Sequence, residues 1–96
     1  MPPFKQPYRF KVVISGKVQG VWFRKHTQET ASSLELTGWV RNEIDGNVQT
    51  EFQGEYQNCI KMLKWLENGS PLSAVTNLKI EQLESRVSEA SFQILV

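Results

Sequence analysis

The residues best suited to chemistry lie between Gly16 and Arg24, where a predicted strand passes into a predicted helix. The helix opens with Phe23-Arg24-Lys25-His26, and its first acidic side chain is Glu29. A helix N-terminus exposes unpaired N–H groups and carries about half a positive charge, so basic residues there are unfavourable. Their placement is explained if an anion binds at the helix end and the cations help to hold it. The alternative is an ordinary solvated basic surface.

The loop before this helix supplies the other half of an anion site. Gly16 and Gly20 let the backbone turn sharply and bring successive N–H groups toward one point. Helical side chains lean toward the N-terminus, so Arg24 is expected to fold back over the loop, where its planar guanidinium suits two phosphate oxygens. Glycines alone would indicate only a plain turn. Together with the basic first turn, they favour a phosphate-binding loop.

Other polar residues carry weaker indications. Asn42 precedes a tight turn and by itself is typical of a residue that initiates one. His26 lies beside the inner stripe of its helix, which favours a packing or surface role over that of a general base. Cys59 falls in the apolar stripe of a second helix and is predicted to be an inert core residue. No pair of His, Cys, Asp or Glu has a metal-ligand spacing, so we predict no metal.

Hydrophobic periodicity predicts the elements that must position these residues. Strands are expected at 8–15, 37–42, 47–53, within 74–83 and at 92–96, and helices at 23–34 and 56–67. Asp45-Gly46 predicts a hairpin, and Gly69 with Pro71 predicts the end of the second helix. The order is that of an α+β, ferredoxin-like split βαβ fold, β-α-β-β-α-β with a short C-terminal strand. We expect an antiparallel sheet with two helices on one face.

Composition indicates one small domain. The chain has 96 residues, of which 40% are hydrophobic and 22% charged, as in an ordinary globular protein. Residues 1–7 contain three prolines and are predicted to be a flexible extension, with the domain over 8–96. A single cysteine cannot form an internal disulfide, and no apolar run approaches the roughly 20 residues of a membrane span. No secretion signal is visible at the N-terminus, so we expect a cytoplasmic protein.

The charge is unevenly distributed. Residues 1–28 hold six basic and no acidic side chains, whereas the other 68 hold five basic and ten acidic ones. A basic end on a chain of net charge +1 indicates a local anion site rather than a long nucleic-acid surface.

Two blocks of the sequence resemble a known family. The segment Gly16-Lys17-Val18-Gln19-Gly20-Val21-Trp22-Phe23-Arg24 closely resembles the acylphosphatase signature of glycine, any residue, valine, glutamine, glycine, valine, any residue, phenylalanine and arginine. The segment Gly38-Trp39-Val40-Arg41-Asn42, followed by Asp45-Gly46-Asn47-Val48, also resembles that family. The resemblance extends over about residues 8–96.

The resemblance implies a hydrolase that cleaves the carboxyl–phosphate bond of small acyl phosphates, yielding a carboxylate and inorganic phosphate. Arg24 would bind the phosphoryl group, and Asn42 would position the attacking water through its side-chain amide. The loop would contribute the backbone N–H groups of Gln19, Gly20, Val21, Trp22 and Phe23. Phosphoryl transfer depends largely on positioning and charge neutralisation, so we expect no metal or cofactor. Inorganic phosphate or sulfate would be a ligand of a monomer with no nucleic-acid or membrane partner.

Two residues depart from the family pattern. Glu35 stands where the family has glycine and, if it keeps a left-handed cap, should cost about 1–2 kcal/mol. Trp22 fills a position that often carries a smaller residue, so it is expected to narrow access to the loop or to form an aromatic wall for the acyl group.

The alternative function is a non-catalytic module that binds an anion or RNA on this fold. An RNA-binding sheet needs exposed aromatic residues on its central strands. The first strand offers Arg9 and Lys11 outward but lacks an aromatic-rich motif.

Overall fold

The computed structural model describes residues 6–96. The extension predicted for residues 1–7 therefore lies outside the described residues except at Gln6 and Pro7. Of these two, Gln6 contacts the domain, because its Oε1 accepts the backbone N–H of Tyr56 at 2.9 Å.

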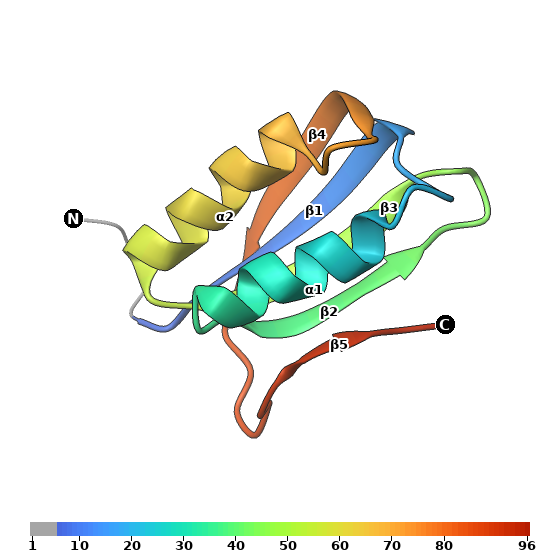
Figure 1. The fold of residues 1–96 in the computed structure, drawn as a ribbon. Coiled ribbons are helices and arrows are strands. Elements are labelled where there is room, and N and C mark those ends of the chain that lie inside the picture. Colours follow the sequence, from blue (N-terminus) through green and yellow to red (C-terminus); the bar gives the residue numbers. More distant parts are fainter. Residues whose placement is uncertain (1–5) are drawn as a thin grey trace.

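The elements follow the predicted order. The strands are β1 (Tyr8–Lys17), β2 (Thr37–Asn42), β3 (Val48–Gly54), β4 (Ala74–Leu83) and β5 (Phe92–Ile94), and the helices are α1 (Phe23–Ser33) and α2 (Tyr56–Asn68). Predicted and observed ends differ most at β1, which is two residues longer, and at β5, which is two residues shorter. The fold is α+β and ferredoxin-like (Figure 1).

The sheet has the order β4-β1-β3-β2-β5. The pairs among β1, β2, β3 and β4 are antiparallel, as predicted, but β2 and β5 are parallel, so the expectation of a wholly antiparallel sheet is wrong at this edge. The chain leaves β4 at the end of the sheet where β2 begins. Because it crosses directly to the other edge, it must enter β5 in the direction of β2 (Figure 1).

Both helices cover the same face of the sheet, as predicted (Figure 1). The core between the layers consists of apolar side chains with at most 8% of their surface exposed, among them Phe10, Val12, Ile14, Phe23, Ala31, Val40, Val48, Phe52, Cys59, Met62 and Leu66. The α1–α2 contact includes the rings of Phe23 and Trp65, whose centroids are 5.7 Å apart. This contact fixes the N-terminal end of α1, which begins at Phe23.

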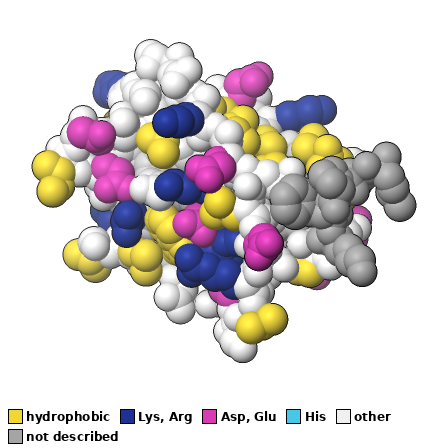
Figure 2. Space-filling model, turned by 180° about the vertical axis from the view of Figure 1, so that it is seen from behind, with side chains coloured by type: hydrophobic (Ala, Val, Ile, Leu, Met, Phe, Trp, Pro, Cys, Tyr) yellow, Lys and Arg dark blue, Asp and Glu magenta, His cyan; other side chains and the backbone are white. Residues whose placement is uncertain are grey.

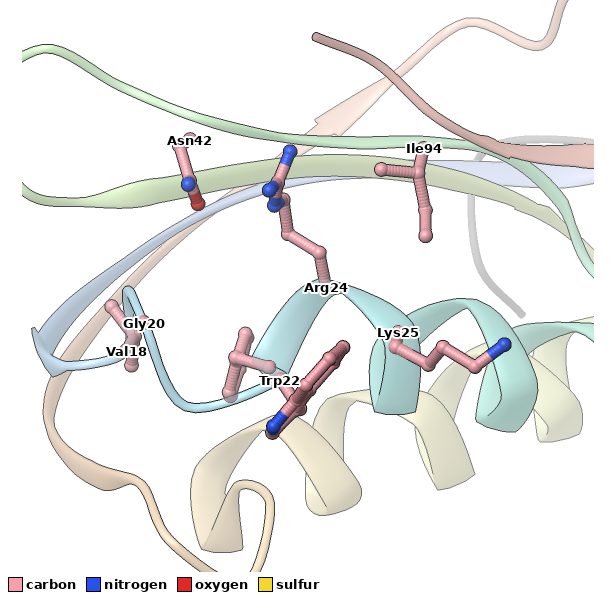
Figure 3. A pocket seen from close by; sticks show the side chains of 8 residues that line it. Val18, Gly20, Trp22, Arg24, Lys25, Asn42 and Ile94 are labelled. Atoms are coloured by element: carbon pink, nitrogen blue, oxygen red, sulfur yellow. The ribbon is translucent and has the colours of Figure 1, made fainter.

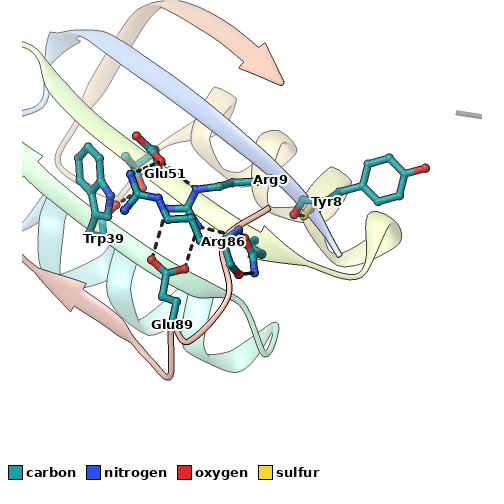
Figure 4. A network of polar contacts seen from close by, with 9 residues as sticks. Tyr8, Arg9, Trp39, Glu51, Arg86 and Glu89 are labelled. Carbon is teal, nitrogen blue, oxygen red and sulfur yellow. Dashed lines mark hydrogen bonds and ion pairs between the residues drawn. The ribbon is translucent and has the colours of Figure 1, made fainter. Parts of the chain in front are cut away.

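The other face of the sheet corrects one prediction. Arg9 does point away from the helices, but it is only 1% exposed. Its guanidinium pairs with Glu51 on β3 at 2.8 Å and with Glu89 at 2.8 Å, as Figure 4 shows. Strand periodicity gives the face of Arg9, but its burial depends on the segment 84–91, which follows β4 and contacts this face.

Hydrogen bonds to the backbone of segment 84–91 also hold it against the sheet. The side-chain oxygen of Gln53 accepts the N–H of Arg86 at 2.7 Å, and its nitrogen donates to the Arg86 carbonyl at 2.8 Å. Elsewhere on the back of the molecule, basic and acidic side chains are interspersed (Figure 2). Lys11, for example, lies in register with Glu51 and Glu81 on the adjacent strands. This mixture does not form the basic, aromatic platform that an RNA-binding sheet requires.

In the part of the chain that the structure describes, neither helix combines the length and the apolar character needed to cross a bilayer.

Candidate active site

The loop between β1 and α1 is anchored by two buried valines. Val18 is 1% exposed and Val21 is 8% exposed. Between and after them, Gly20 and Trp22 adopt left-handed backbone conformations, with φ of 73° and 61°. Alternation of left- and right-handed residues turns neighbouring N–H groups to one side and forms an anion-binding concavity. The loop therefore has the backbone shape that its glycines suggested, with one left-handed position occupied by a tryptophan.

Helix α1 begins without a cap. Trp22, its N-cap residue, makes no side-chain capping hydrogen bond, and the first turn contains no acidic residue. The first N–H groups of a helix have no intrahelical partner, so here they remain available to an anion. Arg24 and Lys25 add positive charge to the same turn. The helix end and the loop form one electropositive surface.

Arg24 extends from α1 toward the sheet. In Figure 3 its guanidinium rises from the helix to the level of Asn42. Nη1 donates to the carbonyl of Leu95, just after β5, at 3.3 Å. The last segment of the chain thus orients the arginine, and the remaining N–H groups of the fork are available for phosphate oxygens.

Asn42 approaches from the opposite side. It is the last residue of β2, it pairs with Val48, and it lies on the same sheet face as Val40, the face that the helices cover. Its Oδ1 is buried and has no hydrogen-bond partner within residues 6–96. This oxygen can therefore accept a hydrogen bond from a molecule bound in the pocket.

The side chain of Gln19 has a role that the sequence did not reveal. Its Nε2 donates to the carbonyls of Glu43 and Asn47, both at 2.8 Å. These carbonyls flank the turn between β2 and β3, so Gln19 links the loop to the hairpin that carries Asn42. Sequence analysis assigned this residue only a backbone contribution, because its partners are 24 and 28 residues away.

The predicted residues surround one pocket of about 400 Å³. Its volume lies in the range of about 300–1,000 Å³ that small-molecule sites occupy. The lining residues are Val18, Gly20, Trp22, Phe23, Arg24, Lys25, Asn42 and Ile94 (Figure 3). Gln19 and Val21 were also predicted for the site, but they do not line the pocket. Gln19 instead bonds to the hairpin, and Val21 is buried in the core.

Three lining residues were not predicted for the site, namely Val18, Lys25 and Ile94. Val18 and Lys25 are sequence neighbours of predicted residues and could have been included for that reason. Ile94 could not, since only the parallel pairing of β5 with β2 brings it to the pocket.

The other titratable candidates lie apart from this pocket. His26 is half-exposed, and its Nδ1 lies 3.6 Å from a carboxylate oxygen of Glu29. Cys59 is fully buried, and burial raises the pKa of its thiol to about 11 although a hydrogen bond with the Gly54 backbone opposes the shift. Within residues 6–96, no three side chains of His, Cys, Asp or Glu are grouped as metal ligands.

The pocket therefore combines the Arg24 guanidinium, several backbone N–H groups and the Asn42 amide oxygen, which has no partner among the residues that the structure describes. The first two suit a phosphate dianion. The third suits a water molecule held beside it, because an amide oxygen accepts an O–H and directs the oxygen lone pair elsewhere.

Comparisons of the sequence and of the structure with known proteins all identify the same family. The family model described as Acylphosphatase matches residues 10–94. An acylphosphatase of Pelotomaculum thermopropionicum is 40% identical over 86 residues, which cover 90% of this chain and 94% of that protein. An acylphosphatase of Syntrophobacter fumaroxidans is 42% identical over 86 residues, covering 90% and 89%. The crystal structure of an acylphosphatase from Bacillus subtilis superposes with a TM-score of 0.89 at 31% identity, covering 93% of this chain and 99% of that one.

Proposed function

This chain belongs to the acylphosphatase family and hydrolyses acyl phosphates, and we propose that the pocket between α1 and the end of β2 carries out the reaction. Arg24 and the backbone of residues 19–23 bind the phosphoryl group, and Asn42 positions water. The observation that carries this assignment is that Arg24, Asn42 and the loop before α1 line one pocket although they come from separate elements.

The phosphoryl group binds at the N-terminus of α1. Two of its oxygens accept from Arg24, and the others accept from the N–H groups of the loop. These donors neutralise the charge that is spread over the equatorial oxygens in the transition state. The bond from Arg24 to the Leu95 carbonyl holds the fork in place before substrate binds.

Asn42 prepares the nucleophile. Its Oδ1 accepts one O–H of a water molecule, which aims a lone pair of the water oxygen at phosphorus. The new phosphorus–oxygen bond forms while the bond to the acyl oxygen breaks, and the bonding electrons leave with the carboxylate. The proton released by the water passes to a phosphate oxygen of the substrate. A carboxylate is a good leaving group, so the reaction requires neither a strong base nor a metal.

The remaining proposals concern the surroundings of this reaction. Inorganic phosphate and sulfate compete with the substrate, because they present the same oxygens to Arg24 and the loop. The enzyme acts as a monomer in the cytoplasm, without cofactor, nucleic acid or membrane. One chain is sufficient for the reaction because every residue assigned to it comes from that chain.

The test is hydrolysis of benzoyl phosphate in the presence of excess chelator. We expect full activity, with inorganic phosphate as a competitive inhibitor. Activity that disappears with chelator and returns with a divalent metal would overturn the metal-free mechanism. Phosphate binding without turnover would instead support a non-catalytic anion-binding module.

Arg24→Ala tests the phosphate assignment in the same assay. We expect weaker inhibition by phosphate together with lower kcat, because the guanidinium contacts both ground state and transition state. Lys64→Ala, on the exposed face of α2, is the control for loss of a positive charge.

A further inference from the structure

Trp22 is an unusual residue at its position. Its backbone is left-handed, with φ of 61°, a conformation that is unfavourable for residues with a Cβ atom and that glycine adopts freely. Its side chain is 73% exposed, so the fold gains little packing from it. Strained residues that contribute little to packing are typical of functional sites. The indole is therefore explained better by a ligand than by stability.

The indole lies at the edge of the active-site pocket. Both Trp22 and Ile94 line the pocket, and in Figure 3 the indole lies beside the start of α1 while Ile94 lies on β5 at the level of the Arg24 guanidinium. Ile94 is also an exposed apolar side chain, at 36%. The two residues add apolar side chains to the lining of a pocket that also holds the polar side chains of Arg24 and Asn42.

The polar and apolar lining residues of the pocket match the two ends of an acyl phosphate, which are a charged phosphoryl group and an acyl group. The phosphoryl group is fixed by Arg24 and the loop, so the acyl group must extend outward from it, toward the opening. We propose that Trp22 and Ile94 bind the acyl group and make this enzyme selective for flat, apolar acyl groups, above all aromatic ones. The inference rests on the proposed function of the pocket. Lys25 also lines the pocket, but its ammonium group points away from the Arg24 guanidinium in Figure 3.

The experiment compares kcat/KM for benzoyl phosphate with kcat/KM for acetyl phosphate. Trp22→Gly should lower this ratio by about twofold to tenfold, the range expected for loss of one aromatic contact. This ratio measures recognition of the acyl group alone, because a change in phosphate binding would alter kcat/KM for both substrates by the same factor. Glycine also suits the left-handed backbone, so the variant should fold.

Three further variants sharpen the result. Trp22→Phe should retain most of the ratio, and Ile94→Ala should lower it less than Trp22→Gly. Val87→Ala changes an apolar side chain that is 90% exposed outside the pocket, and it should leave the ratio at the wild-type value.

The outcomes separate the two proposals. An unchanged ratio in Trp22→Gly, or a wild-type preference for succinyl phosphate over benzoyl phosphate, would overturn the inference and leave the proposed function intact. Failure of the wild type to hydrolyse any acyl phosphate would overturn the proposed function instead.

Discussion

At the scale of single residues, the roles proposed for Arg24 and Asn42 are charge neutralisation and positioning, respectively. Arg24 supplies a permanent cation whose orientation is set by one backbone carbonyl, that of Leu95. Asn42 would supply a neutral acceptor, and its buried oxygen has no partner in the described part of the chain. A neutral amide can hold water next to a phosphate dianion, whereas a carboxylate at this place would repel the substrate.

Removal of the amide should affect turnover more than binding. For Asn42→Ala we expect kcat to fall by about 10²–10³-fold, the usual cost of losing one positioned polar group, while inhibition by phosphate changes little. Stability should not decrease, because the variant removes a buried acceptor that has no partner. Steady-state kinetics, phosphate inhibition and urea unfolding measure these three effects. Wild-type kcat in Asn42→Ala would rule out the water-positioning role.

At the scale of elements, the site depends on contacts between segments that are distant in sequence. Gln19 ties the phosphate loop to the turn after β2, and Leu95 beyond β5 orients the arginine of α1. The strands and helices provide rigid supports, and these few hydrogen bonds link the segments that carry Arg24 and Asn42.

Gln19→Glu tests the first of these contacts. The carboxylate has nearly the same shape but cannot donate to the carbonyls of Glu43 and Asn47. We expect kcat to fall about tenfold or more and phosphate inhibition to weaken less, because the hairpin that Gln19 holds carries the water-positioning residue. Faster amide hydrogen exchange in residues 43–47 would show the loosened turn. Equal losses in kcat and phosphate affinity would indicate damage to the loop itself.

The end of α1 retains the strain that the sequence predicted. Glu35 has φ of 58°, in the left-handed region that glycine adopts freely. Glu35→Gly should therefore raise the free energy of unfolding by about 1 kcal/mol. The matched control is Glu29→Gly inside the same helix, which should lower it by about 1 kcal/mol. Urea denaturation measures both changes, and two changes of the same sign would contradict the explanation.

At the scale of the whole molecule, a largely buried ion pair joins the middle of the sheet to the segment that crosses from one edge to the other. Arg9 on β1 pairs with Glu89, in the segment that leads from β4 at one edge to β5 at the other. Burial alone would raise the pKa of Glu89, but hydrogen bonds from Arg9 and Thr37 and the charges of Arg9 and Arg86 outweigh it and lower that pKa. The pair therefore contributes to the placement of β5 and of the residues that follow it.

This ion pair predicts a pH-dependent stability. Because the pKa of Glu89 is lower in the folded state, its contribution is present above the unfolded value of about 4.3 and is lost as pH falls through the folded value. Glu89→Gln should be less stable than wild type by about 1.5–3 kcal/mol at neutral pH. The difference should shrink below about pH 4. Glu84→Gln, an exposed change in the same segment, should change the free energy of unfolding by less than about 0.5 kcal/mol. A difference between wild type and Glu89→Gln that persists at low pH would exclude the charged pair as its cause.

The sequence by itself determined the order of elements, the sharp turn of the loop before α1 and the strained cap, since each of these depends on residues close together in the chain. Hydrophobic alternation located the strands, and the basic first turn of α1 indicated an anion site from four consecutive residues. Asn42 was identified only through resemblance to a family, because a turn-initiating asparagine and a water-positioning one are identical in local pattern.

Only the tertiary structure decided which side chains reach one another. The parallel pairing of β5 brings Ile94 to the pocket and Leu95 to Arg24, and the crossing segment buries Arg9 beneath Glu89. The side-chain amide of Gln19 likewise bonds to the Glu43 and Asn47 carbonyls only because the β2–β3 hairpin packs against the loop. Local sequence fixes the direction in which a side chain points, but its partner is set by how distant segments pack, and that packing completes the pocket between Gly16 and Arg24.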